Sequence, residues 1–564
     1  MPVVNLESSR IHRLFPGKKI NEIIDILPFI GVDIEGVDDS TIRIEYNPNR
    51  PDFSSDYGIL RSLKGMMEIE VGIPKFKLSQ KSQYIVNVDP MVNQVRPYIV
   101  ALVAKNGRLD DLMIKQLIGM QEDLHNGIGR RRKKASIGIH NLDLINFPVF
   151  YSIVENDDFC FIPIDKTSND TIRQILDKSE SGKKYGHIIN QGHKYPLILD
   201  TKENVISFPP IINGLLTKID KQTRNLFVEV TASSQRIAND TLAIVAITLH
   251  DMGFEVQTVS IRYNGDSDKN IITPKMDPRR IDIEIDYINK MIGLDLGATE
   301  IIKCLEKARF QAWAKEDNGK IICCMVPRYR IDVLNPIDVV EEVLIGYGIY
   351  NLTPNLVPTT LVGQQNSLSF SFNVIRQTLI GMGLLEILNF DLISRKIHNM
   401  ALLTTETENN DYNKNNILTV EETKSIEHEI LRPSLIPSLL HCLSHNVHEE
   451  YPQRLFEIGK VFRSKNNHGI NEYWCTGVIL AHNGANFTEI KAAAQTLLAA
   501  SFGKVISTKP ITNSAFINGR CGAILLDDKP IGIMGEISPM VIENFRIRMP
   551  VSTFEINFSK ILGL

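Results

Sequence analysis

Residues 327–350 read PRYRIDVLNPIDVVEEVLIGYGIY, and they predict an extended segment followed by an amphipathic helix. The pair Asn335-Pro336 predicts the helix start, because Asn is a favoured N-cap and Pro suits the first helical position. Three carboxylates then follow at spacings that place them on one helix face: Asp338, Glu341 and Glu342. Apolar residues occupy another face and predict packing against a core: Val339, Val340, Val343 and Leu344.

The extended segment adds a fourth carboxylate, Asp332, close to the helix start. Four carboxylates repel one another unless a cation lies between them, and a set made only of oxygen donors suits Mg²⁺ better than a transition metal. A plainer alternative stays open on spacing alone. Acidic residues in a first helical turn favour the helix macrodipole and commonly face water.

The wider segment resembles the domain that precedes the catalytic-like domain in the β-subunit family of phenylalanyl-tRNA synthetase. The resemblance rests on a set of short motifs: Pro327-Arg328-Tyr329-Arg330, Asp332, Pro336, Asp338, Glu341-Glu342 and Gly346-Tyr347-Gly348. It implies that Asp332, Asp338, Glu341 and Glu342 bind Mg²⁺. It also implies that the site is shared with a catalytic α subunit, which is a separate chain.

Composition and charge narrow the class of protein. The chain has 564 residues, enough for about four domains, and 43% of them are hydrophobic. Its 62 basic and 66 acidic residues give a net charge of −4, which argues against a surface built for nonspecific nucleic-acid binding. No apolar run reaches the length of a membrane span and the N-terminus has no apolar signal core, so we expect no membrane partner. Seven cysteines without zinc-site spacing predict reduced thiols and a cytoplasmic location.

Residues 90–265 predict a mixed domain with two polar features. A glycine-rich turn leads into a run of five cations that could hold phosphates: Arg130, Arg131, Arg132, Lys133 and Lys134. Further along, Ser207 and Asn213 precede a strand over 226–231, in which Phe227, Glu229 and Thr231 share one face. The plain alternatives are a solvated basic loop and a solvent-facing glutamate.

The segments HNGIGRRRKKASIGIHNLD and FPPIINGLLTKI are similar to the archaeal and eukaryotic branch of the same family, in which this domain hydrolyses mischarged tRNA. The resemblance implies hydrolysis of tyrosine from tRNA(Phe). A carboxylate can accept a hydrogen bond from a phenol, so Glu229 is the first candidate for reading the tyrosine hydroxyl. Ser207 and Asn213 are candidates for positioning the ester or an attacking water. The basic run Arg130–Lys134 would then contact the acceptor end of the tRNA.

Residues 360–564 predict a helix over 369–382 and antiparallel strands that begin with 384–390. The strand Arg454–Phe462 resembles the second motif of a class II aminoacyl-tRNA synthetase core. The third motif of that class ends in an arginine that clamps ATP, but Val551–Phe558 contains none. ATP phosphates need cations, so we expect a catalytic-like domain that does not form the adenylate.

The sequence as a whole predicts an α+β multidomain protein. We expect an N-terminal α/β domain at 1–85, an editing-type domain at 90–265, a magnesium-binding B-type domain at 270–350 and a non-catalytic class II domain at 360–564. The resemblance implies a β subunit that supports ATP-dependent charging of tRNA(Phe) by an α subunit, in a tetramer of two α and two β chains. Two alternatives stay open: a catalytically silent RNA-binding scaffold, and a freestanding aminoacyl-tRNA deacylase.

Overall fold

The chain divides into two compact units, Met1–Leu356 and Val357–Leu564. The computed structural model describes residues 2–79, 83–157, 159–189, 193–263, 270–315, 319–354, 356, 362–402, 417–421, 423–465 and 469–563. Over these residues the protein is a mixed α+β structure with several separate sheets, as the sequence predicts. No helix among them combines the length and the apolar character that crossing a membrane requires.

A small three-stranded sheet opens the first unit, with strand order β1-β3-β2: Val3–Glu7, Thr41–Tyr46 and Val32–Val37. Helix α3 (Asp56–Met66) begins after Ser55, whose side chain accepts a hydrogen bond from the backbone of Gly58. Apolar residues of the sheet and the helix share one core, including Leu6, Ile44 and Leu60.

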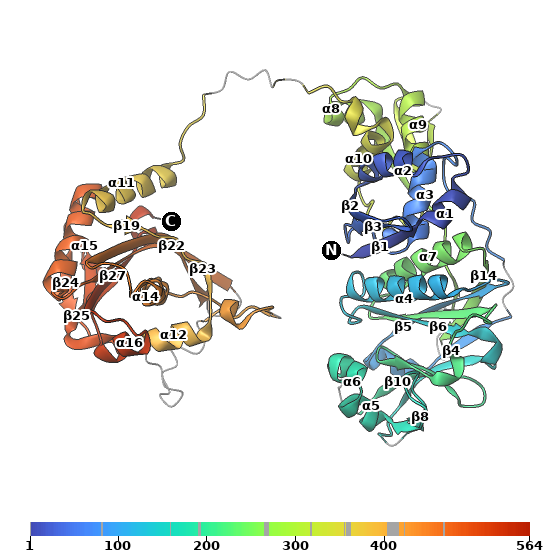
Figure 1. Ribbon diagram of the computed structural model, residues 1–564, viewed down its shortest axis with the longest axis horizontal. Helices are drawn as coiled ribbons and strands as arrows, with labels where there is room; N and C mark the ends of the chain where they lie inside the picture. Colours follow the sequence, from blue (N-terminus) through green and yellow to red (C-terminus); the bar gives the residue numbers. More distant parts are fainter. Residues whose placement is uncertain are drawn as a thin grey trace. The chain divides into compact units, whose positions relative to one another are not determined.

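A ten-stranded sheet forms the middle of the first unit, with the order β12-β11-β10-β7-β4-β14-β5-β13-β6 and β15 paired to β14. Its strands are β4 Ile85–Val88, β5 Tyr98–Lys105, β6 Ala135–Asn141, β7 Val149–Val154, β10 Tyr195–Leu199, β11 Val205–Phe208, β12 Ile212–Asn213, β13 Leu226–Ala232, β14 Glu255–Tyr263 and β15 Ile271–Thr273. Helices α4 (Asp111–Asn126) and α7 (Gln235–Asp251) cover one face around β5, β13 and β6 (Figure 1).

Strand β13 alternates between the two faces as the sequence predicts. Leu226, Val228 and Val230 pack in the core that includes α4 and α7. Phe227 packs in a second core on the other face, which it shares with Glu229 because strand residues alternate. The strand is buried along its whole length, so Glu229 is not the solvent-facing residue of the plain alternative.

The third sheet, with order β16-β18-β17, carries the predicted carboxylate helix. Its strands are Arg279–Glu284, Ile321–Val326 and Gln311–Ala314, packed against α8 (Ile285–Ile292), α9 (Ala298–Lys307) and α10 (Pro336–Tyr347). Helix α10 begins at Pro336 with Asn335 in the N-cap position, as predicted. The extended segment predicted around Asp332 is wrong in detail, because Asp332 lies in a bend of the loop that joins β18 to α10.

That loop also joins two cores. Tyr329 is 4% exposed and packs in the core beneath the ten-stranded sheet, where the Arg61 guanidinium lies 4.7 Å from the centre of its ring. Arg61 is in turn paired with Asp251 at the end of α7 at 2.6 Å. The next residue, Arg330, is paired with Glu342 of α10.

The second unit is a seven-stranded sheet with order β19-β22-β23-β27-β26-β25-β24: Leu385–Glu386, Gln453–Lys465, Gly469–Ala481, Val551–Asn557, Lys529–Ile537, Phe516–Leu526 and Ser507–Pro510. Helices α11 (Ser367–Gly381) and α15 (Phe487–Phe502) pack on one face, and α14 (Ile436–His445) packs on the other (Figure 1).

The antiparallel prediction for this sheet needs one correction. The pairs from β22 to β24 are antiparallel, but the edge strand β19 pairs parallel with β22. Strand β19 is also shorter than the predicted 384–390. Beyond the end of β19, the backbone N–H of Asn389 donates to the Glu457 side chain at 3.2 Å. This N–H therefore bonds to a carboxylate and not to the backbone carbonyl of a neighbouring strand.

Candidate functional site: a polar cavity in the first unit

The three residues predicted for hydrolysis line one cavity of about 350 Å³. Glu229 comes from β13, Ser207 from β11 and Asn213 from β12. Apolar residues of α4 and β6 complete its wall, among them Leu117 and Ile139. Sequence positions that lie up to 22 residues apart therefore meet at one pocket. Its lining is divided almost evenly between apolar and polar residues, so it suits a ligand that has both an apolar body and polar groups.

Glu229 is a buried titratable group in the wall of this cavity. Its side chain is 1% exposed, and Oε2 has no hydrogen-bond partner among the described residues. Burial raises the pKa of Glu229 to about 8, against the opposing effects of the Ser207 hydroxyl and the Arg96 guanidinium. The sequence hypothesis treats Glu229 as a carboxylate, but near neutral pH this site favours the carboxylic acid, which can both donate and accept a hydrogen bond.

Ser207 and Asn213 are cross-strand neighbours on β11 and β12. The Ser207 hydroxyl donates to Asn213 Oδ1 at 3.0 Å, and Ser207 is buried while Asn213 is partly exposed. This bond fixes the Asn213 amide so that its NH₂ group can be directed elsewhere. The pair therefore offers polar contacts at the wall of the cavity rather than an activated nucleophile.

His140 is a residue that the sequence hypothesis did not single out. It lies on β6, is fully buried, and its Nδ1 is 2.9 Å from Thr217 Oγ1. Its Nε2 has no partner within the described part of the chain, and burial lowers the pKa of His140 to about 3. A neutral imidazole with a free nitrogen thus lies on the same sheet face as Glu229.

Gly138 brings these two side chains close to the same point. It pairs directly with Glu229 across the β6–β13 ladder. A Cβ atom at Gly138 would lie 2.4 Å from Glu229 Oε1 and 2.5 Å from His140 Nε2. The signal that could have found His140 is the alternation of Ser136, Gly138 and His140, which places the three residues on one face of strand β6.

The basic run lies between α4 and β6, and its members differ in exposure. Arg130, Arg131 and Lys133 are exposed, whereas Arg132 and Lys134 are partly buried. Arg132 also lines the cavity and contacts the backbone carbonyls of Pro210 and Ile211. The run is therefore a surface loop with one member directed inward.

Two of the four predicted metal ligands, Asp332 and Glu342, are paired with an arginine. Arg330 donates to Asp332 through Nε at 3.0 Å and through Nη2 at 2.7 Å, and it pairs with both oxygens of Glu342. Burial alone would raise the pKa of Asp332, but the Arg330 guanidinium holds it below its usual range. Arg50 of the N-terminal Asn-Arg-Pro-Asp turn approaches Asp332 to 3.9 Å.

The other two predicted ligands have different environments. Asp338 Oδ2 accepts hydrogen bonds from the backbone N–H groups of Leu334 and Asn335, both at 2.7 Å. Glu341 is exposed, and its pKa is raised by partial burial and by repulsion from Glu342, Asp332 and Asp338. The oxygen donors suit Mg²⁺, but as arranged they do not form an ion cage. No group of three acidic, histidine or cysteine residues in the described ranges is placed to hold an ion.

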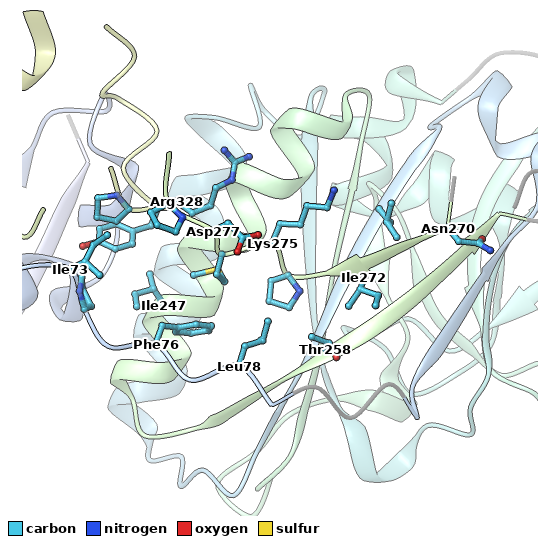
Figure 2. Close-up of a pocket in the computed structure, with 17 residues that line it drawn as sticks. Ile73, Phe76, Leu78, Ile247, Thr258, Asn270, Ile272, Lys275, Asp277 and Arg328 are labelled. Carbon is cyan, nitrogen blue, oxygen red and sulfur yellow. The ribbon is translucent and has the colours of Figure 1, made fainter. Parts of the chain in front are cut away.

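A larger cavity of about 810 Å³ lies elsewhere in the first unit and contains none of the predicted site residues. Figure 2 shows its apolar floor of Phe76, Leu78 and Ile247, with Lys275 and Arg328 among the residues around it. Arg328 is paired with Asp240 at 2.5 Å, so one of the two cations is already neutralised.

Comparisons with known proteins show which family has this sequence and architecture. Residues 281–349 match the tRNA synthetase B5 domain, and residues 354–558 match the phenylalanyl tRNA synthetase beta chain CLM domain. The chain is therefore part of an aminoacyl-tRNA synthetase. Its relatives narrow this class further. The chain is 36% identical over 560 residues to the phenylalanine–tRNA ligase beta subunit of Archaeoglobus fulgidus, covering 99% of this chain and 98% of that protein.

Two further comparisons agree. The beta subunit of the same ligase from Methanococcus aeolicus is 35% identical, with 98% of this chain and 99% of that protein covered. A solved N-terminal fragment of the phenylalanyl-tRNA synthetase beta subunit from Pyrococcus horikoshii is 31% identical, with a TM-score of 0.58 over 61% of this chain and 99% of the fragment. The chain belongs to the family of phenylalanine–tRNA ligase β subunits, as the sequence motifs predict.

Proposed function

We propose that this chain supports the ATP-dependent charging of tRNA(Phe) by an α subunit and hydrolyses tyrosine from mischarged tRNA(Phe). The observation that carries the hydrolytic part is the convergence of Glu229, Ser207 and Asn213 on one cavity. The family membership supports the synthetic part.

Hydrolysis of the tyrosyl ester would correct charging errors, which arise because tyrosine differs from phenylalanine by a single hydroxyl group. A pocket built for phenylalanine rejects an added hydroxyl poorly, whereas a second site that hydrogen-bonds the hydroxyl recognises it directly. Glu229, neutral in its buried site, can accept from the phenol and donate to it. Asn213 and Ser207 then orient the ester or a water molecule near the cavity wall, and exposed cations such as Arg130 hold the acceptor end by phosphate contacts.

The second unit, in this proposal, is a class II synthetase domain that does not use ATP. Gly477 lies between Glu457 and Glu555 in the sheet register, on the face that α14 covers. A Cβ at Gly477 would lie 2.8 Å from Leu439 Cδ1, so α14 fills this face. Arg432 is 2% exposed and is held by Glu457 at 2.5 Å, which leaves it unavailable to a phosphate.

Association with an α subunit is supported by exposed apolar side chains on α11 and around β19. Five of them are more than half exposed: Phe370 61%, Ile380 53%, Leu385 65%, Leu388 82% and Phe390 79%. Apolar side chains that gather at a surface mark protein contacts more often than chance exposure does. We propose an assembly of two α and two β chains in the cytoplasm.

We also propose that Asp332, Asp338, Glu341 and Glu342 bind Mg²⁺. The four oxygen donors and the mutual repulsion at Glu341 favour a cation. Binding requires Arg330 to release Asp332 or Glu342, because it is now paired with both. The ion would supply charge to the cluster and hold the subunit boundary.

Deacylation of Tyr-tRNA(Phe) by the holoenzyme tests the hydrolytic part. We expect the wild-type enzyme to clear the mischarged tRNA, and Glu229→Ala to slow the clearance while phenylalanine charging continues. Clearance by the mutant at the wild-type rate would show that Glu229 does not read the hydroxyl. No clearance by the wild type would refute the hydrolytic role, and failure to copurify with an α subunit would refute the synthetic one.

A further inference from the structure

Arg132 connects three walls of the cavity. Its Nη1 donates to the carbonyl oxygens of Pro210 at 3.2 Å and Ile211 at 3.0 Å, and its Nη2 donates to Glu122 Oε1 at 2.7 Å. The guanidinium also lies 4.5 Å from the centre of the Tyr185 ring, at the end of α6 (Glu180–Tyr185). One side chain thus contacts the loop between β11 and β12, helix α4 and helix α6.

The Glu122 contact belongs to a longer network. His125 Nδ1 lies 3.1 Å from Glu122 Oε1, and His125 Nε2 accepts from the backbone N–H of Ile137 at 2.8 Å. His125 and Arg132 together hold the pKa of Glu122 down at about 2, so Glu122 is a carboxylate at neutral pH. The network therefore runs from the β11–β12 loop through Arg132 and α4 to strand β6.

The backbone around Arg132 is held in an uncommon conformation. Arg130, Arg131 and Arg132 have φ values of 45°, 54° and 64°, in the left-handed region that non-glycine residues rarely adopt. The backbone N–H of Arg132 donates to the carbonyl of His125 at 3.0 Å. This reversal of the chain turns Arg132 inward while Arg130 and Arg131 stay exposed.

We propose that Arg132 is a positioning residue that fastens the β11–β12 loop to α4 and so fixes the width of the cavity beside Ser207 and Asn213. This inference rests on the hydrolytic function proposed above and revises one of its parts, because the sequence hypothesis counts Arg132 among the phosphate ligands. Its side chain is 16% exposed, and each of its two terminal nitrogens donates to a group of the cavity wall or of α4. A planar fork with fixed donors suits this task, whereas a lysine ammonium cannot reach two carbonyls and a carboxylate in the same geometry.

Amide hydrogen exchange on the full-length chain tests the fastening without any activity. We compare Arg132→Ala and Arg132→Lys with Arg130→Ala, which removes an exposed cation from the same loop. We expect both Arg132 variants to speed exchange in residues 205–213 by about 10-fold or more, the effect of losing a hydrogen bond to a charged group. Arg130→Ala is expected to leave that exchange unchanged. Wild-type exchange in both Arg132 variants would overturn the proposal.

Deacylation kinetics on the holoenzyme separate a positioning role from a phosphate contact. If Arg132 positions the cavity wall, both of its variants lower kcat by about 10-fold and leave the salt dependence of KM unchanged. A phosphate ligand would instead raise KM, reduce the salt slope by about 1 and be largely restored in Arg132→Lys, and that result would overturn the proposal. If the wild-type holoenzyme does not deacylate, the hydrolytic function fails, and the exchange experiment still decides the role of Arg132.

Discussion

Glu229 and Gly138 are direct partners across the β13–β6 ladder, and a Cβ atom on Gly138 would lie 2.4 Å from Glu229 Oε1. The missing side chain therefore makes room for the Glu229 carboxyl group. The Glu229 side chain is 1% exposed, so its packed surroundings leave Oε1 less room to move away than a surface side chain has.

This relationship predicts the effect of Gly138→Ala. The added methyl group should displace Glu229 and His140 and lower deacylation by about 10-fold or more, while phenylalanine charging continues. The measurement is the rate of Tyr-tRNA(Phe) clearance by the holoenzyme. The matched control is Gly119→Ala on α4, where an added Cβ meets nothing within 4 Å. Equal rates for the two variants would show that space at Gly138 is unimportant.

The raised pKa of Glu229 predicts a pH dependence of stability. The folded chain keeps a proton on Glu229 up to about pH 8, whereas the unfolded chain loses it near pH 4.5. The folded state therefore binds more protons in this window, and the free energy of unfolding falls as pH rises, by at most about 1.4 kcal/mol for each pH unit. Glu229→Gln should flatten this dependence in urea unfolding curves. Parallel curves for the wild type and the variant would contradict the assignment.

Arg330→Ala should be strongly destabilising. It leaves Asp332 and Glu342 partly buried without their counter-charge, which costs about 3–5 kcal/mol for a buried pair that loses one partner. Chemical denaturation with and without added Mg²⁺ measures this loss. Arg280→Ala is the control, because its pair with Asp282 is exposed and should contribute little. An Arg330 variant as stable as the control would show that the carboxylates need no internal cation.

Removal of divalent cations tests the magnesium proposal. Chelation should weaken association of the α and β chains, since the carboxylates would lose the ion's charge. Sedimentation of the complex in excess chelator, compared with excess Mg²⁺, is the measurement. Glu341→Ala should reproduce the effect of chelation in part. A complex that sediments identically in both buffers argues that association does not depend on an ion at these carboxylates.

The purified chain should not form an aminoacyl-adenylate. Arg432 is committed to Glu457, and strand β27 contains no arginine that could clamp ATP. Exchange of pyrophosphate into ATP in the presence of phenylalanine is the assay, and a preparation free of α chain is essential. Exchange above background by such a preparation would contradict the prediction.

Local patterns predicted much of this structure from sequence. The N-cap and proline at Asn335-Pro336 predicted the start of α10, because these signals act within one turn. The alternation in 226–231 separated Glu229 from Val228 correctly, because strand periodicity is also local. The sequence hypothesis even selected three residues that line one cavity, with the help of the family resemblance.

Contacts between distant segments were not predictable in this way. His140 can be recognised as a neighbour of Glu229 only from the strand register that places Gly138 opposite Glu229. That register pairs β6 with β13, and the two paired residues are 91 positions apart in the chain. Arg132 turns inward through three consecutive left-handed residues, which a run of cations does not suggest. Arg330 appeared in the motif as a basic residue, yet its role as the partner of Asp332 and Glu342 needed coordinates.

The loop between β18 and α10 has a consequence for building chimeric enzymes. Tyr329 packs in the core of the ten-stranded sheet, while Arg330, the next residue, is paired with Glu342 of α10. In a chimera of two relatives, a junction between these two residues would take the core around Tyr329 from one protein and the ion pair of Arg330 from the other. Junctions that keep 327–342 from a single parent, together with Arg61 and Arg50, should preserve both environments when domains are exchanged between relatives.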